Sequence, residues 1–200
     1  MTRQSLKSID WYTQVGEGCY ASALANFLLF RREYLLAQKV YREYRAHPLV
    51  RADGASLAGL APRLLRDLTH GQYEGTLHLK GNLNGCVPNR SLEYGKEKFA
   101  AISRAIICER KRGTICTERN LSFMESLPTM LAIERNYQHS KEDSQKLESC
   151  EPYGGGHWIV ACLRGIIDDG KFWEYNPQLL DVQGAFVVTK SPAVVLPYNR

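Results

Sequence analysis

This chain of 200 residues has no C-x-x-C pair, no internal repeat, no low-complexity tract and no apolar run long enough to span a membrane. Its six cysteines are widely spaced, at positions 19, 86, 108, 116, 150 and 162. That spacing excludes the common zinc and dithiol redox motifs, so neither a metal nor another cofactor is expected. No membrane association is expected either.

The first residues also lack a targeting signal. Residues 1–7 read MTRQSLK and are followed by no apolar segment, which predicts that there is no cleaved signal peptide. We therefore expect a cytoplasmic protein with reduced thiols, or one exported as an effector without a cleaved signal.

The sequence has no long uninterrupted run of charged residues of one sign. There are 26 Lys and Arg against 21 Asp and Glu, which gives a net charge of +5. The basic residues gather in 31–66 and 96–119, but acidic residues interrupt both clusters, a pattern typical of solvated helical faces. This balance argues against a nucleic-acid partner and allows an acidic protein partner. The sequence leaves the oligomeric state open.

The front of the chain has mainly helical patterns. The strongest covers residues 19–46, with a break expected near Arg31 and Arg32. Further helices are predicted over 57–68 and 93–111, with a short helix or turn over 121–132 and one short strand over 75–79. Residues 47–150 contain no motif that we can assign to a function.

The back of the chain has mainly strand patterns. After a polar segment at 137–151, which we predict to be a surface loop, short strands are expected at 157–163, 172–175, 179–182, 185–189 and 193–196. The prediction is therefore one α+β domain over residues 1–200. A helical lobe (about 1–135) would pack on an antiparallel β lobe (about 136–200).

One stretch organises the chemistry: a glycine-flanked turn leads through Cys19 into the longest helix. Unpaired N–H groups and the dipole at a helix N-terminus stabilise negative charge, and the thiolate is the nucleophilic form of cysteine. Cys19 is therefore a candidate nucleophile, with a buried packing role as the alternative.

A nucleophilic cysteine needs a base, and His157 is the best candidate. It follows three glycines and begins an apolar strand, which would hold the ring while leaving space beside it. The other histidines are expected at helix ends, in the polar loop or on a strand: 47, 70, 78 and 139.

A third group must orient the base. We expect Asn176, on the antiparallel return toward the start of the His157 strand, to accept a hydrogen bond from the imidazole; the alternative is a simple Asn-Pro turn. Asp181, Asp168 and Asp169 are other candidates, although the last two are expected at the far end of the hairpin from His157.

The order cysteine, histidine, asparagine resembles the papain-like cysteine peptidases. His157 follows Cys19 by 138 residues and Asn176 follows His157 by 19, which fits the usual interval of about 130–150 residues after the cysteine. The segments CYASALA, GHWIVA and YNP look most like the bacterial C39-like branch.

In that branch a glutamine shortly before the cysteine donates to the oxyanion, together with the cysteine N–H, and Gln14 is the matching residue here. The chain departs from the branch in three ways: Gln14 stands five residues before Cys19, one fewer than is common; Tyr20 stands where glycine is frequent; and Asn176-Pro177 replaces Asp-Pro.

The resemblance implies a peptidase of papain-like fold that cleaves peptide or isopeptide bonds through a thioester. Cys19 would be the nucleophile, His157 the base, Asn176 its orienting partner and Gln14 an oxyanion donor, with a protein or peptide as substrate. The same triad also serves acyltransferases, transglutaminases and deamidases. A non-catalytic effector or adaptor that binds an acidic partner is the remaining alternative.

Overall fold

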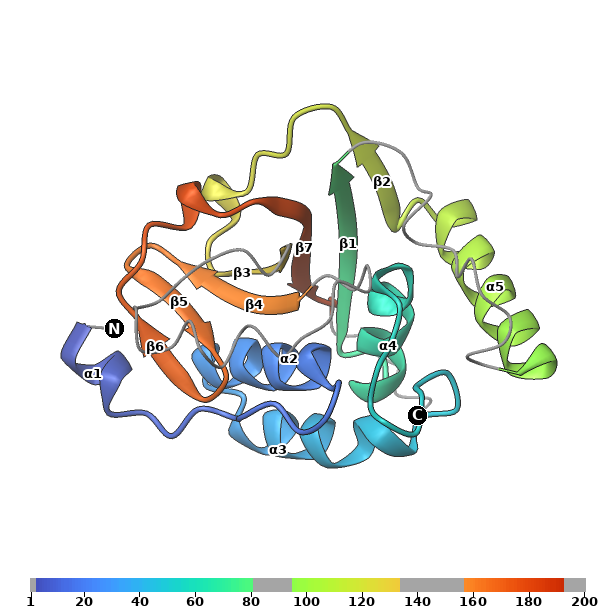
Figure 1. The fold of residues 1–200 in the computed structure, drawn as a ribbon, viewed down its shortest axis with the longest axis horizontal. Helices are drawn as coiled ribbons and strands as arrows, with labels where there is room; N and C mark the ends of the chain where they lie inside the picture. The colour runs from blue at the N-terminus through green and yellow to red at the C-terminus, as the bar shows by residue number, and fades with distance from the viewer. Residues whose placement is uncertain (1–2, 81–94, 134–156, 193–200) are drawn as a thin grey trace, which may run out of the picture.

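The computed structural model describes residues 3–80, 95–133 and 157–192. One sheet of seven strands forms the centre of the described part, in the order β2-β1-β7-β3-β4-β5-β6, and helices cover one of its faces (Figure 1). The strands are β1 (Tyr73–Lys80), β2 (Ile115–Glu118), β3 (Thr129–Ile133), β4 (His157–Cys162), β5 (Gly165–Asp168), β6 (Lys171–Trp173) and β7 (Val182–Lys190). The α+β class expected from the sequence is confirmed.

In the described residues, five α-helices accompany the sheet: α1 (Arg3–Lys7), α2 (Cys19–Phe30), α3 (Tyr34–Glu43), α4 (Ala61–Leu68) and α5 (Lys96–Lys111). The break predicted near Arg31 and Arg32 is present, because Arg32 has a φ of 65° and α3 starts two residues later. Pro62 falls in the first turn of α4, where its missing N–H removes no helical bond.

The predicted division at residue 135 is not the one the structure has. Strands β1, β2 and β3 come from the expected helical lobe and pair within the same sheet as β4 to β7. The sheet is also mixed rather than antiparallel, since β1 and β2 run parallel. The last predicted strand, at 193–196, and the polar segment at 137–151 lie outside the described residues.

The short helix or turn expected over 121–132 is also wrong in part. A 3-10 turn covers Met124–Ser126, but the central strand β3 follows it, and all five of its residues are buried. A short, continuously apolar run fits a fully buried strand as well as a buried helix, so periodicity could not separate the two. Similarly, the strand predicted at 179–182 is wrong in part, because Leu179 ends a 3-10 turn over Pro177–Leu179 and β7 begins only at Val182.

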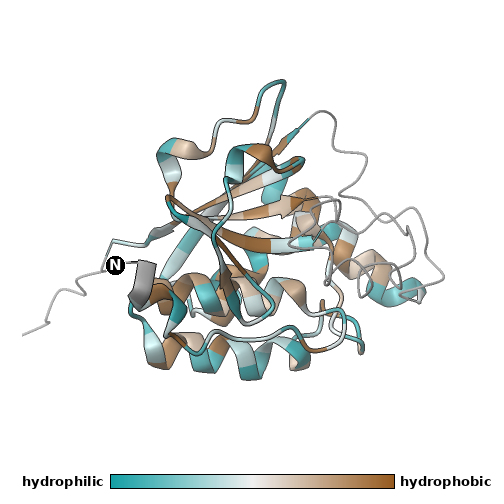
Figure 2. Ribbon diagram, turned by 60° about the vertical axis from the view of Figure 1, so that its left-hand side comes forward, coloured by the Kyte–Doolittle hydropathy of each residue, from teal (hydrophilic) through white to brown (hydrophobic). Residues whose placement is uncertain are grey.

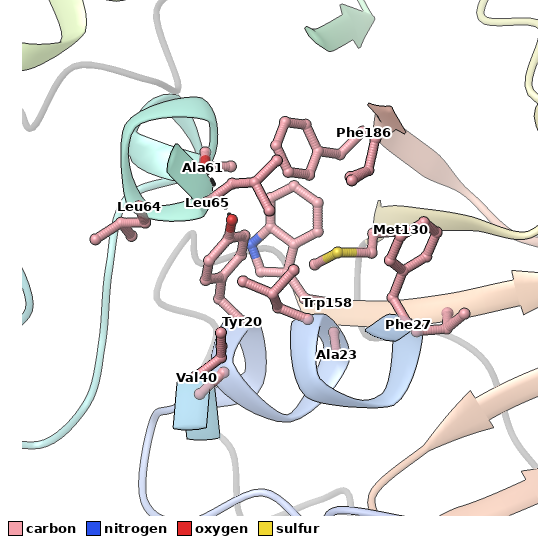
Figure 3. Packing of buried hydrophobic residues seen from close by; sticks show 14 of the residues in the cluster. Tyr20, Ala23, Phe27, Val40, Ala61, Leu64, Leu65, Met130, Trp158 and Phe186 are labelled. Carbon is pink, nitrogen blue, oxygen red and sulfur yellow. Dashed lines mark hydrogen bonds between the residues drawn. The ribbon is translucent and has the colours of Figure 1, made fainter. Parts of the chain in front are cut away.

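The larger hydrophobic core lies between the helices and one face of the sheet. Apolar residues lie along the strands and on the helix sides that face the sheet, and polar residues lie on the outer sides of the helices (Figure 2). Helix α2 is buried from Tyr20 to Leu28, as expected for a helix that neighbouring elements surround. Tyr20 packs edge-on to Trp158 of β4, with ring centroids 5.4 Å apart (Figure 3). Its hydroxyl donates a 2.8 Å hydrogen bond to the carbonyl of Ala61.

A second core covers the opposite face of the sheet. Alternate residues of β3 and β4, such as Leu131 and Ile159, meet Phe123 and Leu180 from the segments that flank β3 and β7. Each strand at the centre is therefore covered on both faces, which holds β4 and its first residue, His157, in a fixed position. Within the described ranges, no helix is both long and apolar enough to cross a membrane.

Candidate active site

Cys19 is the first residue of α2, and Gly18 is the cap. The N–H groups of Ala21 and Ser22 both reach back to the Gly18 carbonyl, at 3.0 and 3.3 Å. No side chain caps the helix, and the N–H groups of Cys19 and Tyr20 have no backbone acceptor among the described residues. The thiol therefore stands at a helix N-terminus with unpaired backbone donors beside it.

The family resemblance places a glycine where this chain has Tyr20. Here Tyr20 is 2% exposed and fills the space between α2, α4 and β4. Its side chain therefore lies in the core, where it contacts Ala61 and Trp158.

His157 is the first residue of β4 and is only 6% exposed. Its Nε2 lies 2.6 Å from Oδ1 of Asp168, the last residue of β5. The hairpin between β4 and β5 explains this contact, because its turn is at Leu163 and Arg164 and each step along β5 goes back one residue on β4. Asp168 is thereby returned toward the start of β4.

Asn176 does not make the contact that the sequence led us to expect. It is exposed, and its Oδ1 accepts a 3.1 Å hydrogen bond from the N–H of Gln178, so it caps the 3-10 turn Pro177–Leu179. The carboxylate beside the imidazole belongs instead to Asp168. The prediction placed the hairpin turn at 168–170 and so set Asp168 far from His157. The apolar run Gly165-Ile166-Ile167, directly after Leu163-Arg164, was the signal for the earlier turn.

Burial and two neighbouring side chains set the charge of the His157 imidazole. Burial by itself lowers the pKa of His157, but the hydrogen bond and charge of Asp168 and the interaction with the Cys19 side chain outweigh it and raise the pKa to about 9. The imidazole is therefore protonated at neutral pH. Because Asp168 occupies Nε2, Nδ1 is the nitrogen left for the thiol; it is buried and makes no conventional hydrogen bond with the described residues.

Gln14 lies on the irregular arm that leads to α2 and is half-buried. Its side-chain Nε2 donates a 2.6 Å hydrogen bond to the carbonyl of Gly16, and its backbone N–H donates a 3.0 Å bond to Oδ1 of Asp169. The side-chain amide of Gln14 is thus directed along the arm toward Gly16, which stands three residues before Cys19.

The arm is tied to α2 and α3 as well. The buried Asn26 bonds both polar groups of the Tyr12 backbone, accepting from its N–H at 2.7 Å and donating to its carbonyl at 2.9 Å. Tyr41 donates to the carbonyl of Thr13 at 2.7 Å. Asn26 therefore connects the middle of the cysteine helix to the segment that precedes it.

A second loop closes against the last part of the arm. The N–H of Glu17 donates to the carbonyl of Asp53 at 3.0 Å, and Arg45 donates to the carbonyl of Val15 at 2.8 Å. Gly16 has a φ of 57°, and a Cβ there would stand 2.6 Å from the Asp53 carbonyl oxygen. Only glycine fits this close approach.

The remaining thiols have different surroundings. Cys108 is exposed, Cys116 is half-buried, and burial raises the pKa of the Cys162 thiol. Cys86 and Cys150 lie outside the described residues. The structure brings Cys19, His157 and Asp168 together in the order thiol, imidazole, carboxylate, the arrangement that nucleophilic cysteine chemistry requires.

Comparisons of this chain with protein-family models, with curated proteins and with solved structures gave no match. Across the described ranges, no three His, Cys, Asp or Glu side chains are placed to hold a metal ion. The geometry of the site is therefore the basis for a functional assignment.

Proposed function

We propose that this protein is a papain-like cysteine hydrolase that cleaves peptide or isopeptide bonds through a thioester at Cys19. The observation that supports this most directly is the buried His157, which carries a positive charge between a carboxylate and a thiol. An imidazolium favours the thiolate form of a neighbouring cysteine. A structural histidine capping a strand would need neither partner.

The proposed first step is attack of the Cys19 sulfur on the carbonyl carbon of the scissile amide. A C–S bond forms, and the carbonyl oxygen becomes an oxyanion that accepts from the N–H of Cys19 and from the second hydrogen of Gln14 Nε2. His157 then donates the proton on Nδ1 to the leaving nitrogen, and the C–N bond breaks.

In the second step water replaces the amine. His157, now neutral, takes a proton from the water as it attacks the thioester carbonyl. Collapse of the intermediate breaks the C–S bond, releases a carboxylic acid and restores the Cys19 thiolate beside the protonated His157. Asp168 keeps the ring oriented through both steps and stabilises its charged form, the task that the sequence assigned to Asn176.

The test is the reactivity of each cysteine toward iodoacetamide at pH 7, measured by peptide mass spectrometry. We expect Cys19 to alkylate at least about tenfold faster than the exposed Cys108, because the protonated His157 interacts with the side chain of Cys19. His157→Asn should reduce the Cys19 rate to that of Cys108. Cys108→Ala is the matched control and should leave fast labelling in place.

If all thiols alkylate at similar rates, the proposed nucleophile is wrong. If Cys19 is selectively reactive, a peptide library assayed with and without an added amine identifies the reaction. Cleavage without amine incorporation supports hydrolysis, whereas amine incorporation without cleavage would contradict it in favour of acyl transfer.

A further inference from the structure

Two consecutive aspartates serve the site from one turn. Asp168 ends β5 and binds the imidazole of His157, while Asp169 binds the backbone N–H of Gln14 at 3.0 Å. His157 and Gln14 are far apart in the sequence, yet each is bound by one of these two adjacent aspartates. Any shift of this turn therefore moves both the carboxylate that binds the imidazole and the acceptor that holds the arm of Gln14.

The turn has little freedom to shift. Asp169 and Gly170 both have positive φ, at 42° and 75°, so they form a tight left-handed turn between β5 and β6. Gly170 lies directly against the arm: a Cβ there would stand 2.4 Å from the Cγ2 of Thr13 and 3.4 Å from the carbonyl oxygen of Trp11. The arm and the turn are therefore in close contact beside the Asp169 hydrogen bond.

The orientation of Gln14 depends on that contact. Its side-chain amide is directed along the arm by the bond to the Gly16 carbonyl. An NH₂ group has two hydrogens, and this bond uses one. The position of the second is set by the backbone of Gln14, whose N–H is fixed by Asp169.

We propose that Asp169 is a positioning residue that sets the second oxyanion donor, Gln14, while Asp168 sets the base. This rests on the proposed function, because it assigns Gln14 to the oxyanion. Asp169 acts only through the arm. Its loss therefore slows reactions that pass through an oxyanion but does not slow direct alkylation of the Cys19 sulfur.

Two small reagents separate these effects without knowledge of the substrate. Iodoacetamide alkylates the sulfur with loss of iodide and forms no oxyanion. 4-Nitrophenyl acetate acetylates the sulfur: the C–S bond forms, an oxyanion develops on the acetyl carbonyl, and 4-nitrophenolate leaves. Both products are quantified at Cys19 by peptide mass spectrometry, and Cys19→Ala supplies the background.

The informative variants are Asp169→Gly and Asp169→Asn. Glycine accepts a φ of 42° without strain but lacks the carboxylate, whereas asparagine tolerates the same φ and retains an oxygen acceptor. We expect Asp169→Gly to slow acetylation of Cys19 about tenfold, part of the loss caused by removing an oxyanion donor, while alkylation changes less than about twofold. Asp169→Asn should restore acetylation.

A double-mutant cycle tests whether Asp169 acts through Gln14. Gln14→Ala should show the same selective loss of acetylation, and Asp169→Gly should add nothing to it in the double variant. Additive losses, or equal slowing of alkylation and acetylation by Asp169→Gly, would overturn the proposal.

The two proposals fail differently. If wild-type Cys19 alkylates no faster than Cys108, the proposed function fails, whatever Asp169 does. If Cys19 is selectively reactive and Asp169→Gly acetylates at the wild-type rate, only the role of Asp169 is wrong. Thermal unfolding of each variant identifies any loss of rate that comes from a loss of fold.

Discussion

At the scale of single residues, the main feature is a buried histidine that keeps its charge. Burial opposes the charged form of His157, and the carboxylate of Asp168 at 2.6 Å together with the Cys19 side chain more than compensates. The bond to Asp168 also leaves Nδ1 as the ring nitrogen for the thiol. Asp168 thus orients the proposed base and contributes to its charge.

The first prediction concerns this titration. Followed by NMR at the imidazole Cε1–H, His157 should titrate near pH 9 in the wild type. Asp168→Asn removes the negative charge and should lower the midpoint by about one unit or more. Asn176→Ala removes only a turn cap and should leave it near 9. A shift of equal size in both variants would contradict the assignment of Asp168.

At the scale of elements, the hairpin of β4 and β5 and the turn that follows it build most of the site. The residues Leu163 and Arg164 reverse the chain, and β5 brings Asp168 back toward His157. Strand β5 in turn lies against β6, and there is little space between them: a Cβ on Gly165 would stand 2.0 Å from the backbone oxygen of Trp173.

Gly165→Ala should therefore destabilise the protein by about 2–3 kcal/mol, because the clash is with backbone and cannot be relieved by a side-chain rotation. The control is Gly113→Ala. Gly113 has a φ of 75° but open space around it, so alanine there should cost only about 1–2 kcal/mol of conformational strain. Urea denaturation of both variants measures the difference, and equal losses would show that β5 and β6 are not packed as described.

At the scale of the whole molecule, the site joins parts of the chain that are far apart in sequence. The thiol comes from α2 on one face of the sheet, the imidazole and carboxylate come from β4 and β5 within it, and the arm before α2 contacts the turn after β5 (Figure 1). The ionisation of His157 is therefore coupled to global folding.

This coupling predicts how stability depends on pH. The pKa of His157 is raised from 6.5 to about 9 in the folded protein, so between these values the folded state binds more protons than the unfolded state. The contribution of His157 to the free energy of unfolding should be fully present below about pH 6.5 and lost as the pH rises through 9.

The measurement is urea denaturation between pH 6 and 9.5 in the wild type and in Asp168→Asn. The two proteins differ only at residue 168, so the difference between the two curves reports the effect of the Asp168 carboxylate on the charge of His157. The wild type should lose more stability across this range than the variant. Parallel curves would show that Asp168 does not hold the charge on His157.

The sequence by itself determined the elements that depend on local patterns. The apolar run after Gly18 predicts α2 with Cys19 at its start, and the apolar run after residue 156 predicts β4 with His157 at its start. Both depend on residues that are close together in the chain, so periodicity and turn residues were sufficient to place them.

Only the tertiary structure decided what depends on pairing between distant segments. The register of the β4–β5 hairpin, set by a two-residue turn, exchanged Asn176 for Asp168 beside the imidazole. Strand β1 joined the sheet beside β7, β3 joined it between β7 and β4, and β2 joined it at the edge beside β1. Such contacts arise from long-range packing, which short patterns do not record.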